Sequence, residues 1–259
     1  MKRYERQAKI LQLVSQRGFV ENEELSRLFS VTQGTIRRDI KTLAGHNQIR
    51  IEHGGTASLD LFSNFIEPRY ETKYHLNIQQ KKAIAAEAVS HIDNDQTIIL
   101  DSGTTNFQIA RLLCDRRLLK LTVITCDIQI ARLLCSQETF TVILLGGMLR
   151  KNYCYSYGFI ASNILENLIA DKFFLGIDAI SLNAGITCAT LDEIPLKRAA
   201  MKASSEVVAV VDSSKFGICT PYRLCDWEDI HCILTDDRAE LSYLEYFRQQ
   251  GCKVIASSA

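Results

Sequence analysis

Residues 22–45 read NEELSRLFSVTQGTIRRDIKTLAG. Asn22 can cap a short helix, and Thr32 can cap a second helix that runs to the end of this stretch, because both residue types accept hydrogen bonds from free N–H groups at a helix start. Only Ser30 and Val31 separate the two helices. Two helices joined by so tight a turn are typical of a helix-turn-helix.

The flanking sequence predicts a winged form of this motif. Residues 4–17, YERQAKILQLVSQR, place apolar residues at helical spacing, and Gly18 ends that helix. Residues 48–58, QIRIEHGGTAS, alternate isoleucine with charged residues before a Gly-Gly turn, which predicts a short β-hairpin. Three helices and a hairpin together predict a winged helix-turn-helix domain over residues 1–57.

Charge is distributed unevenly along a chain that is neutral as a whole, with 30 basic and 30 acidic residues in 259. Residues 1–57 contain ten Lys or Arg and six Asp or Glu, so the remaining residues carry a deficit of four positive charges. A small basic unit joined to a mildly acidic body fits a DNA-binding head on a separate domain.

The helix after Thr32 is predicted to present a polar and basic side, because Ile36, Ile40 and Leu43 form its buried stripe. In a helix-turn-helix this exposed side enters the major groove, where Arg clamps phosphates or reads guanine and Gln and Thr bond base edges. An arginine pair taken alone favours a plain solvated helix face, but the tight turn and the basic hairpin favour DNA. The predicted DNA-binding residues are Thr32, Gln33, Thr35, Arg37, Arg38, Lys41 and Arg50.

From Lys81 onward, short apolar segments alternate with amphipathic helices, which predicts a largely parallel α/β sheet covered on both faces over residues 81–259. Residues 58–80 contain Pro68 and many polar residues without strong periodicity, so they are predicted to be an ordered linker. The predicted strands are residues 97–100, 121–125, 140–145, 172–177, 206–211, 231–235 and 253–257.

The carboxyl ends of four predicted strands carry glycines or polar residues, and ligands of open α/β sheets bind beyond those ends. The stretch DSGTT (101–105) directly precedes a helix, whose N-terminal N–H groups and positive potential suit a phosphate. Hydroxyls, glycines, lysines and carboxylates at one edge suit a polyol with one phosphate. The predicted effector-binding residues are Asp101, Ser102, Gly103, Thr104, Thr105, Gly146, Gly147, Asp178, Glu193, Lys197, Asp212 and Lys215.

Each of these features also has a plainer interpretation. A glycine-rich loop after a strand is common, Asp212 and Lys215 fit an ion pair within a loop, and Glu193–Lys197 fits a surface pair worth only ~0.2–0.5 kcal/mol. Their convergence on one edge of the sheet favours a shared pocket.

Cofactors, metals and membranes are not predicted. Nine cysteines are scattered over residues 114–252 without a C-x-x-C pair, which argues against a disulfide framework and a zinc site. No G-x-G-x-x-G or Walker pattern is present. The charged start, MKRYERQAKI, lacks the apolar stretch of a signal peptide, and no apolar run approaches the ~20 residues that span a bilayer. These features predict a cytoplasmic protein.

The chain resembles the DeoR family of bacterial transcriptional repressors over essentially its full length. The N-terminal resemblance covers residues 5–57 and includes TIRRD (35–39) and HGG (53–55). The C-terminal resemblance rests on six motifs in the family's order, which are LDSGTT (100–105), LLGG (144–147), DKFFLGIDAI (171–180), NAGIT (183–187), DEIPLKRA (192–199) and VDSSKFG (211–217).

This resemblance implies a sensor domain similar in fold to ribose-phosphate isomerases, a phosphorylated sugar or sugar alcohol as effector, and a homo-oligomer (dimer or tetramer) on double-stranded operator DNA. Phosphate contacts would fall to residues 102–105, and the other pocket roles to Asp178, Glu193, Lys197, Asp212 and Lys215. Two positions depart from the family pattern, which are Gly34 in the predicted recognition helix and Phe159 in CYSYGFIAS (154–162).

The leading hypothesis is therefore a repressor of a carbohydrate-utilisation operon that a phosphorylated sugar or sugar alcohol releases from its operator. The alternative is a sugar-phosphate isomerase or lyase with an accessory DNA-binding head, because carboxylates and lysines can transfer protons. Against the enzyme stands the complete DNA-binding unit, which an isomerase does not need. Activation instead of repression remains open at this stage, since operator position decides the sign.

Overall fold

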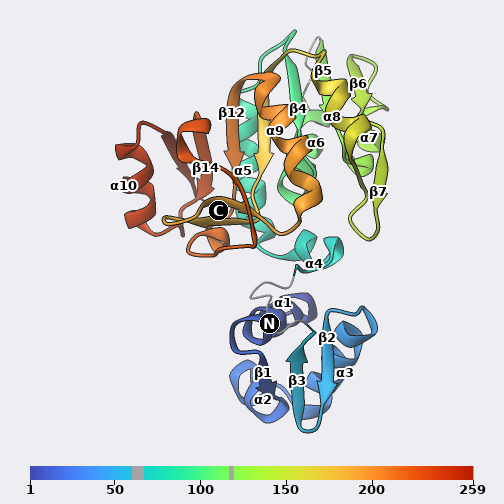
Figure 1. Ribbon diagram of the computed structural model, residues 1–259, viewed down its shortest axis with the longest axis vertical. Coiled ribbons are helices and arrows are strands. Elements are labelled where there is room, and N and C mark those ends of the chain that lie inside the picture. The colour runs from blue at the N-terminus through green and yellow to red at the C-terminus, as the bar shows by residue number, and fades with distance from the viewer. Residues whose placement is uncertain (60–66, 117–119, 259) are drawn as a thin grey trace. The chain divides into compact units, whose positions relative to one another are not determined.

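The computed structural model describes residues 1–59, 67–116 and 120–258. The chain divides into two compact units, Met1–Leu76 and Asn77–Ala259 (Figure 1). Each unit has its own hydrophobic core.

The first unit is a winged helix-turn-helix. Its core joins Ile10 and Val14 of the first helix to Leu25 of the second and Ile36 and Ile40 of the third, as the helical spacing predicts. The strands form an antiparallel sheet of order β1-β3-β2, in which β2 and β3 make the wing. The elements are α1 (Arg3–Arg17), β1 (Phe19–Glu21), α2 (Asn22–Phe29), α3 (Gln33–Gly45), β2 (Ile49–Glu52) and β3 (Gly55–Ser58).

The two predicted helix caps have different outcomes. The Thr32 side chain caps α3 by accepting a hydrogen bond from the backbone N–H of Thr35. Asn22 is the first residue of α2 and not its cap, because the chain leaves β1 directly into the helix with Glu21 at the cap position.

The segment predicted as a linker contains helix α4 (Tyr70–His75) and the first turn of α5 (Ile78–Ser90), while residues 60–66 lie outside the described residues. Helix α4 packs against α1 within the first unit, where the rings of Tyr4 and His75 stack with centroids 4.7 Å apart. The second unit begins directly after Leu76.

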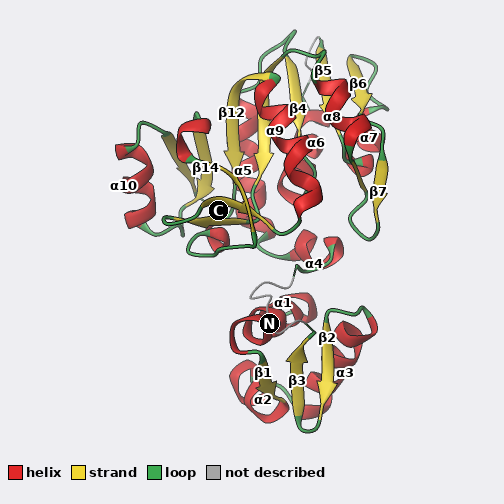
Figure 2. Cartoon of the chain, in the orientation of Figure 1, coloured by secondary structure: helices red, strands yellow, loops and turns green. Residues whose placement is uncertain are grey.

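The second unit is built on a seven-stranded parallel sheet of order β15-β14-β12-β9-β4-β5-β6 (Figure 2). The chain runs from β4 outward to β6, returns to β9 on the other side of β4, and continues outward to β15. The strands are β4 (Thr97–Leu100), β5 (Leu121–Thr125), β6 (Phe140–Leu144), β9 (Ala170–Gly176), β12 (Ser204–Val210), β14 (Cys232–Asp236) and β15 (Lys253–Ser257).

Helices cover both faces of this sheet, which is why its strands are apolar on both sides. Phe174 of β9 packs on one face, and its neighbours Phe173 and Leu175 pack on the other. One face carries residues of α5, α6 (Thr104–Cys114) and α7 (Ile128–Leu134), and the other carries residues of α8 (Phe159–Leu165), α9 (Ile194–Lys202) and α10 (Leu241–Gln249).

Two small antiparallel elements of the second unit were not predicted from the sequence, and neither was the short strand β1 of the first unit. A hairpin pairs β7 (Met148–Arg150) with β8 (Tyr155–Tyr157), and a separate sheet has the order β10-β11-β13. The strands of that sheet are β10 (Ala179–Ser181), β11 (Gly185–Cys188) and β13 (Tyr222–Cys225). No helix in the described part of the chain is both long and apolar enough to cross a membrane.

Candidate functional site

Helix α3 carries the predicted polar and basic side on its exposed surface. Gln33, Arg37, Arg38 and Lys41 are exposed, while the stripe that includes Ile36 is buried. Thr32 is exposed at the N-cap, and Thr35 is half-buried. At Gly34 an added Cβ would meet the Thr32 hydroxyl, at 3.9 Å, and no other atom of the described residues within 4 Å, so their packing does not require glycine there.

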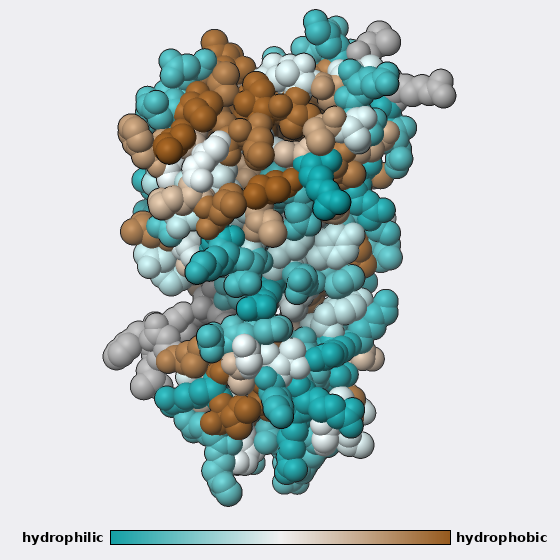
Figure 3. Space-filling view, turned by 90° about the vertical axis from the view of Figure 1, so that its right-hand side faces the viewer, coloured by the Kyte–Doolittle hydropathy of each residue, from teal (hydrophilic) through white to brown (hydrophobic). Residues whose placement is uncertain are grey.

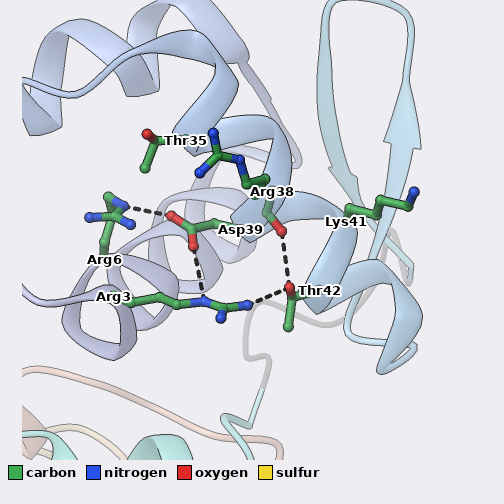
Figure 4. A pocket seen from close by; sticks show the side chains of 7 residues that line it. All are labelled: Arg3, Arg6, Thr35, Arg38, Asp39, Lys41 and Thr42. Carbon is green, nitrogen blue, oxygen red and sulfur yellow. Dashed lines mark hydrogen bonds and ion pairs between the residues drawn. The ribbon is translucent and has the colours of Figure 1, made fainter.

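Asp39, the last residue of TIRRD, points inward and holds α1 against α3, a role that was not predicted. It is 1% exposed and pairs with Arg6, whose guanidinium is also buried (Figure 4). The Gln7 amide donates to the other carboxylate oxygen at 3.3 Å, and Arg3 lies 3.5 Å away. The signal was available, because an aspartate in the register of an apolar stripe needs a buried partner.

A hollow of about 410 Å³ lies beside this pair (Figure 4). Arg3, which is well exposed, crosses it to donate to the Thr42 hydroxyl at 2.7 Å. The lining cations give this flank of α3 a positive surface that extends beyond the predicted residues. The lining residues are Arg3, Arg6, Thr35, Arg38, Asp39, Lys41 and Thr42.

The wing places one predicted residue on its exposed edge. Arg50 of β2 is exposed and pairs with Glu52 at 2.8 Å. The turn between the strands uses Gly54 with φ +77°, a conformation that glycine adopts without strain. Gly55 lies against Phe19, since a Cβ there would stand 2.4 Å from its ring. The turn chemistry and this close approach explain the Gly-Gly pair.

In the second unit, an aspartate follows within two residues of the end of each of four neighbouring parallel strands. In sheet order β12, β9, β4 and β5 are followed by Asp212, Asp178, Asp101 and Asp127. Strands β4 and β9 are the pair at which the chain reverses its direction of winding, the place where open α/β sheets bind ligands. The topology therefore brings the predicted loops to one edge, and it adds Asp127.

Asp101 and Lys197 form a buried ion pair at the centre of this edge. The Asp101 carboxylate also accepts hydrogen bonds from the backbone N–H of Gly176 at 3.0 Å and of Ser102 at 2.8 Å. Burial lowers the pKa of Lys197, but the charges of Asp101 and Glu193 outweigh it, and the pKa lies above its usual value. Lys197 is therefore a fixed positive charge, and Asp101 positions the loop that follows β4.

Glu193 gathers residues that are distant in sequence. Its Oε1 accepts hydrogen bonds from the Tyr155 hydroxyl at 2.5 Å, the Arg150 guanidinium at 2.9 Å and the Thr190 hydroxyl at 3.0 Å. Its Oε2 lies 3.7 Å from Nζ of Lys197. Burial, followed by the Glu193 charge, raises the pKa of Tyr155, so this hydroxyl stays a donor. The β7–β8 hairpin is thus tied to the centre of the edge.

The DSGTT loop leads directly from β4 into the start of helix α6. Gly103 is the N-cap of α6 with φ +124°, and its N–H donates to the Asp127 carboxylate at 3.3 Å. Burial raises the pKa of Asp127 to about 6 despite hydrogen bonds from three backbone N–H groups. Asn106, in the first turn of α6, is 1% exposed, and neither polar atom of its amide has a partner within the described residues.

The remaining predicted residues lie around this centre. Asp178 accepts a hydrogen bond from the backbone N–H of Ala189 at 3.1 Å, and one of its oxygens lies within 4.8 Å of ligand atoms of Cys188 and Glu193. Nζ of Lys197 lies 3.7 Å from Glu193, so its positive charge offsets the negative charge of the cluster that Asp178, Cys188 and Glu193 form. Gly146 and Gly147 join β6 to β7 and are exposed.

Asp212 and Lys215 form a neighbouring group after β12. Burial raises the pKa of Asp212, but the charges of Lys81 and Lys215 and two side-chain hydrogen bonds outweigh it, so the pKa lies below its usual value. One of those bonds comes from the Asn77 amide at 2.8 Å. All nine cysteines are free.

Two family models match the chain in consecutive stretches. Residues 6–61 match the DeoR-like helix-turn-helix domain, and residues 76–237 match the DeoR C terminal sensor domain. The chain belongs to the DeoR family. As a member of that family it is a DNA-binding transcriptional regulator, and the enzyme alternative is not supported.

Relatives of this DeoR-family chain align over nearly all of it. A putative aga operon transcriptional repressor of Escherichia coli O157:H7 is 34% identical, over 97% of this chain and 93% of that protein. The GolR regulator of Listeria innocua is 32% identical, over 97% of both. The glycerol-3-phosphate regulon repressor of Escherichia coli K12 is 31% identical, over 95% of both.

Among solved structures, ribose 5-phosphate isomerase A of Methanocaldococcus jannaschii aligns with 54% of this DeoR-family chain and 55% of its own, with 19% identity and a TM-score of 0.40. Membership of the family rests on the sequence matches.

Proposed function

We propose that this chain is a cytoplasmic repressor of a carbohydrate-utilisation operon, and that a phosphorylated sugar or sugar alcohol releases it from double-stranded operator DNA. The observation that carries the proposal is the exposed basic side of α3, held in place by the buried Asp39–Arg6 pair behind it. The names of the relatives described above, two of which are repressors, support repression over activation.

For DNA, α3 supplies both kinds of contact. Arg37, Arg38, Lys41 and wing Arg50 are assigned to phosphates, and Thr32, Gln33 and Thr35 to base edges. The exposure of the four cations supports this division, because a long charged side chain in solvent can reach the backbone on either side of the groove.

For the effector, the start of α6 receives the phosphate. The first backbone N–H groups of a helix lack intrahelical partners and carry positive potential, and Gly103 brings the backbone close. Ser102, Thr104 and Thr105 add hydroxyls, and Asp178, Gly146 and Gly147 border the space for the polyol. Asp101, Glu193 and Lys197 are assigned to holding these loops, since their charges pair with each other and with neighbouring groups.

Two further observations support a ligand at this edge. The Asn106 amide is buried and has no hydrogen-bond partner among the residues that the structure describes, and unsatisfied buried polar groups concentrate at binding sites. One relative is named for glycerol 3-phosphate, which is itself a phosphorylated sugar alcohol. Release requires that the ligand favour a conformation with poor operator geometry, because equal affinity for both states shifts nothing.

DNA binding is tested with a fluorescently labelled promoter fragment from the operon adjoining the gene. The Arg37→Ala, Arg38→Ala double variant should bind at least 100-fold more weakly, and its slope of log affinity against log salt should fall by about 2, since each lost phosphate contact removes ~0.9. The matched control is the Arg17→Ala, Arg27→Ala double variant, whose arginines are exposed but pair with Glu24 and Glu23 outside α3. Equal affinity of both double variants would contradict the proposal.

Effector binding is tested by thermal shift against glycerol 3-phosphate, hexitol phosphates and sugar phosphates, each beside its unphosphorylated form. A phosphorylated compound should raise the melting temperature and weaken operator binding, and its free form should do neither. Equal stabilisation by the unphosphorylated polyol would contradict the assignment of a phosphate site to the start of α6.

A further inference from the structure

The second unit carries an apolar surface that its own core does not explain. Six large apolar side chains of β7, α8 and the loop between α8 and β9 are between 36% and 86% exposed. Figure 3 shows apolar residues gathered on this side of the unit. We call these residues the β7–α8 surface; they are Met148, Leu149, Phe159, Ile160, Ile164 and Ile169.

The surface is continuous where β7 meets the start of α8. A Cβ added at Gly158, the N-cap of α8, would stand 3.1 Å from the Met148 methyl, so the two elements touch there. Phe159 and Ile160 follow at once, and Ile164 lies one turn further along the same helix.

Helix α8 is apolar on two sides. Ala161 and Leu165 face the core of the second unit and pack with α9, while Phe159, Ile160 and Ile164 face solvent. A surface helix normally has one apolar side, which faces the core of its own domain. A helix with apolar residues on two opposite sides is normally packed against other protein surfaces on both sides. The helix contains no charged residue, which disfavours a nucleic acid or an anionic membrane as the covering partner.

The exposed area fits a protein partner of ordinary size. The six residues expose roughly 700 Å², more than the ~300–600 Å² of the largest patch on a typical monomer and close to the ~800 Å² that each partner contributes to a stable interface. A self-complementary apolar patch is the usual basis of a two-fold interface, because the same surface is buried on both copies.

We infer that a second copy of this chain docks on the β7–α8 surface, in a two-fold arrangement that buries Phe159 and Ile160 of both copies. The inference rests on the proposed function, because DNA binding is what would require two copies. Each chain has one recognition helix, and a pair of operator half-sites needs two. It gives the proposed homo-oligomer a defined interface.

The same strand links this interface to the effector site. Met148 and Leu149 lie on the surface, and the next residue, Arg150, donates to Glu193 at 2.9 Å and to the Tyr155 hydroxyl at 2.7 Å. A change at Glu193 therefore acts on the strand that contacts the second copy. Ligand occupancy and the spacing of the two DNA-binding units would be coupled through three consecutive residues.

The test is the mass of the full-length protein by analytical ultracentrifugation over 0.1–50 µM (on the order of a typical interface Kd range). The wild type should sediment at twice the 29.2 kDa of the chain or a higher multiple. The Phe159→Glu, Ile160→Glu double variant should dissociate at least 100-fold more readily, and a Met148→Gln, Leu149→Gln variant should do the same from the other element. Both pairs are exposed, so far-UV circular dichroism should match the wild type.

The matched control is Leu241→Glu, which changes a 69%-exposed leucine of α10 outside the surface and should keep the wild-type mass. A monomeric wild type, or double variants with the wild-type mass, would overturn the inference. Flotation of a monomeric wild type with phosphatidylcholine vesicles would reassign the surface to lipid.

The outcome is independent of DNA binding. If the proposed function fails, the mass measurement still stands. If the interface is wrong while the function holds, the surface variants keep both the wild-type mass and operator affinity.

Discussion

The side-chain amide of Asn77 donates hydrogen bonds to Oδ1 of Asp212 at 2.8 Å and to the Ser214 hydroxyl at 3.1 Å. Asn77 is the first residue of the second unit, and Leu76 is the last of the first. Its φ of 51° is left-handed, a conformation that asparagine tolerates better than most residues. These hydrogen bonds hold the loop after β12 against Asn77, the residue that directly follows the DNA-binding unit in the chain.

This contact predicts that Asn77 carries coupling between effector and operator. Asn77→Gly keeps the left-handed backbone and removes only the side-chain hydrogen bonds. Affinity for the operator without effector should change less than threefold, while the factor by which effector weakens DNA binding should fall about tenfold, within the usual range of coupling free energies. Operator titrations with and without the compound found by thermal shift measure this factor. Asp95→Gly, at another left-handed position, is the control and should keep full coupling.

The buried Asp39–Arg6 pair predicts a stability effect without any contact to DNA. Asp39→Ala leaves the Arg6 guanidinium buried and unpaired, so unfolding of the first unit should become easier by about 3–5 kcal/mol. Hydrogen exchange of the α1 amides measures this unit separately from the second. Arg38→Ala, one residue away and exposed, should lower operator affinity and leave exchange unchanged. If Asp39→Ala also left exchange unchanged, the pair would not be what holds α1 to α3.

The periodicity of the first unit predicted its helices and wing because local signals dominate there. Apolar spacing, the Thr32 cap and the Gly-Gly turn each depend on neighbours within a few residues. The burial of Asp39 was not predicted, although it stands in the register of Ile36, Ile40 and Leu43, because a charged residue next to the exposed Arg37 and Arg38 fits a solvent-facing helix side equally well. Asp127 was not predicted as a residue of this edge either, although it follows its strand as Asp212 and Asp178 follow theirs.

The partners of Glu193 could not be predicted from local signals. Arg150 and Tyr155 lie 43 and 38 residues from it in sequence, and only the path of the β7–β8 hairpin brings them together. The sequence placed Glu193 and Lys197 on a helix as an ordinary pair. In the structure both side chains are buried. Nζ of Lys197 pairs with the carboxylate of Asp101, which is 96 residues away in sequence.

The two glycines before β7 provide a matched pair of substitutions. Gly147 has φ +143°, and a Cβ there would stand 2.4 Å from the backbone oxygen of Tyr157, whereas a Cβ at Gly146 meets nothing within 4 Å. Gly147→Ala should therefore displace the β7–β8 hairpin, lower the stability of the second unit by at least ~1 kcal/mol and weaken effector binding. Gly146→Ala should leave urea unfolding within about 0.5 kcal/mol of the wild type. Equal unfolding of the two variants would show that the hairpin does not need this close approach.

Asp127 predicts how stability depends on pH. Its pKa rises from 3.8 to about 6 on folding because the carboxyl is buried. Between these values the folded state binds more protons than the unfolded state, so the contribution of Asp127 is fully present below pH 3.8 and is lost as pH rises through 6.

The loss between pH 4.5 and 7 should be about 2 kcal/mol, since each unit of pKa shift corresponds to ~1.4 kcal/mol. Urea unfolding of the wild type and of Asp127→Asn at each pH isolates this change, because other carboxyls contribute equally to both proteins. Asparagine keeps an oxygen that accepts from the N–H groups of Gln129 and Ile130. Its amide nitrogen faces the Gly103 N–H, and the loss of stability from that unfavourable contact is the same at every pH. The wild type should therefore lose stability relative to the variant as pH rises. A difference that stayed constant, or grew with pH, would mean that the carboxyl is ionised in the folded protein throughout this range.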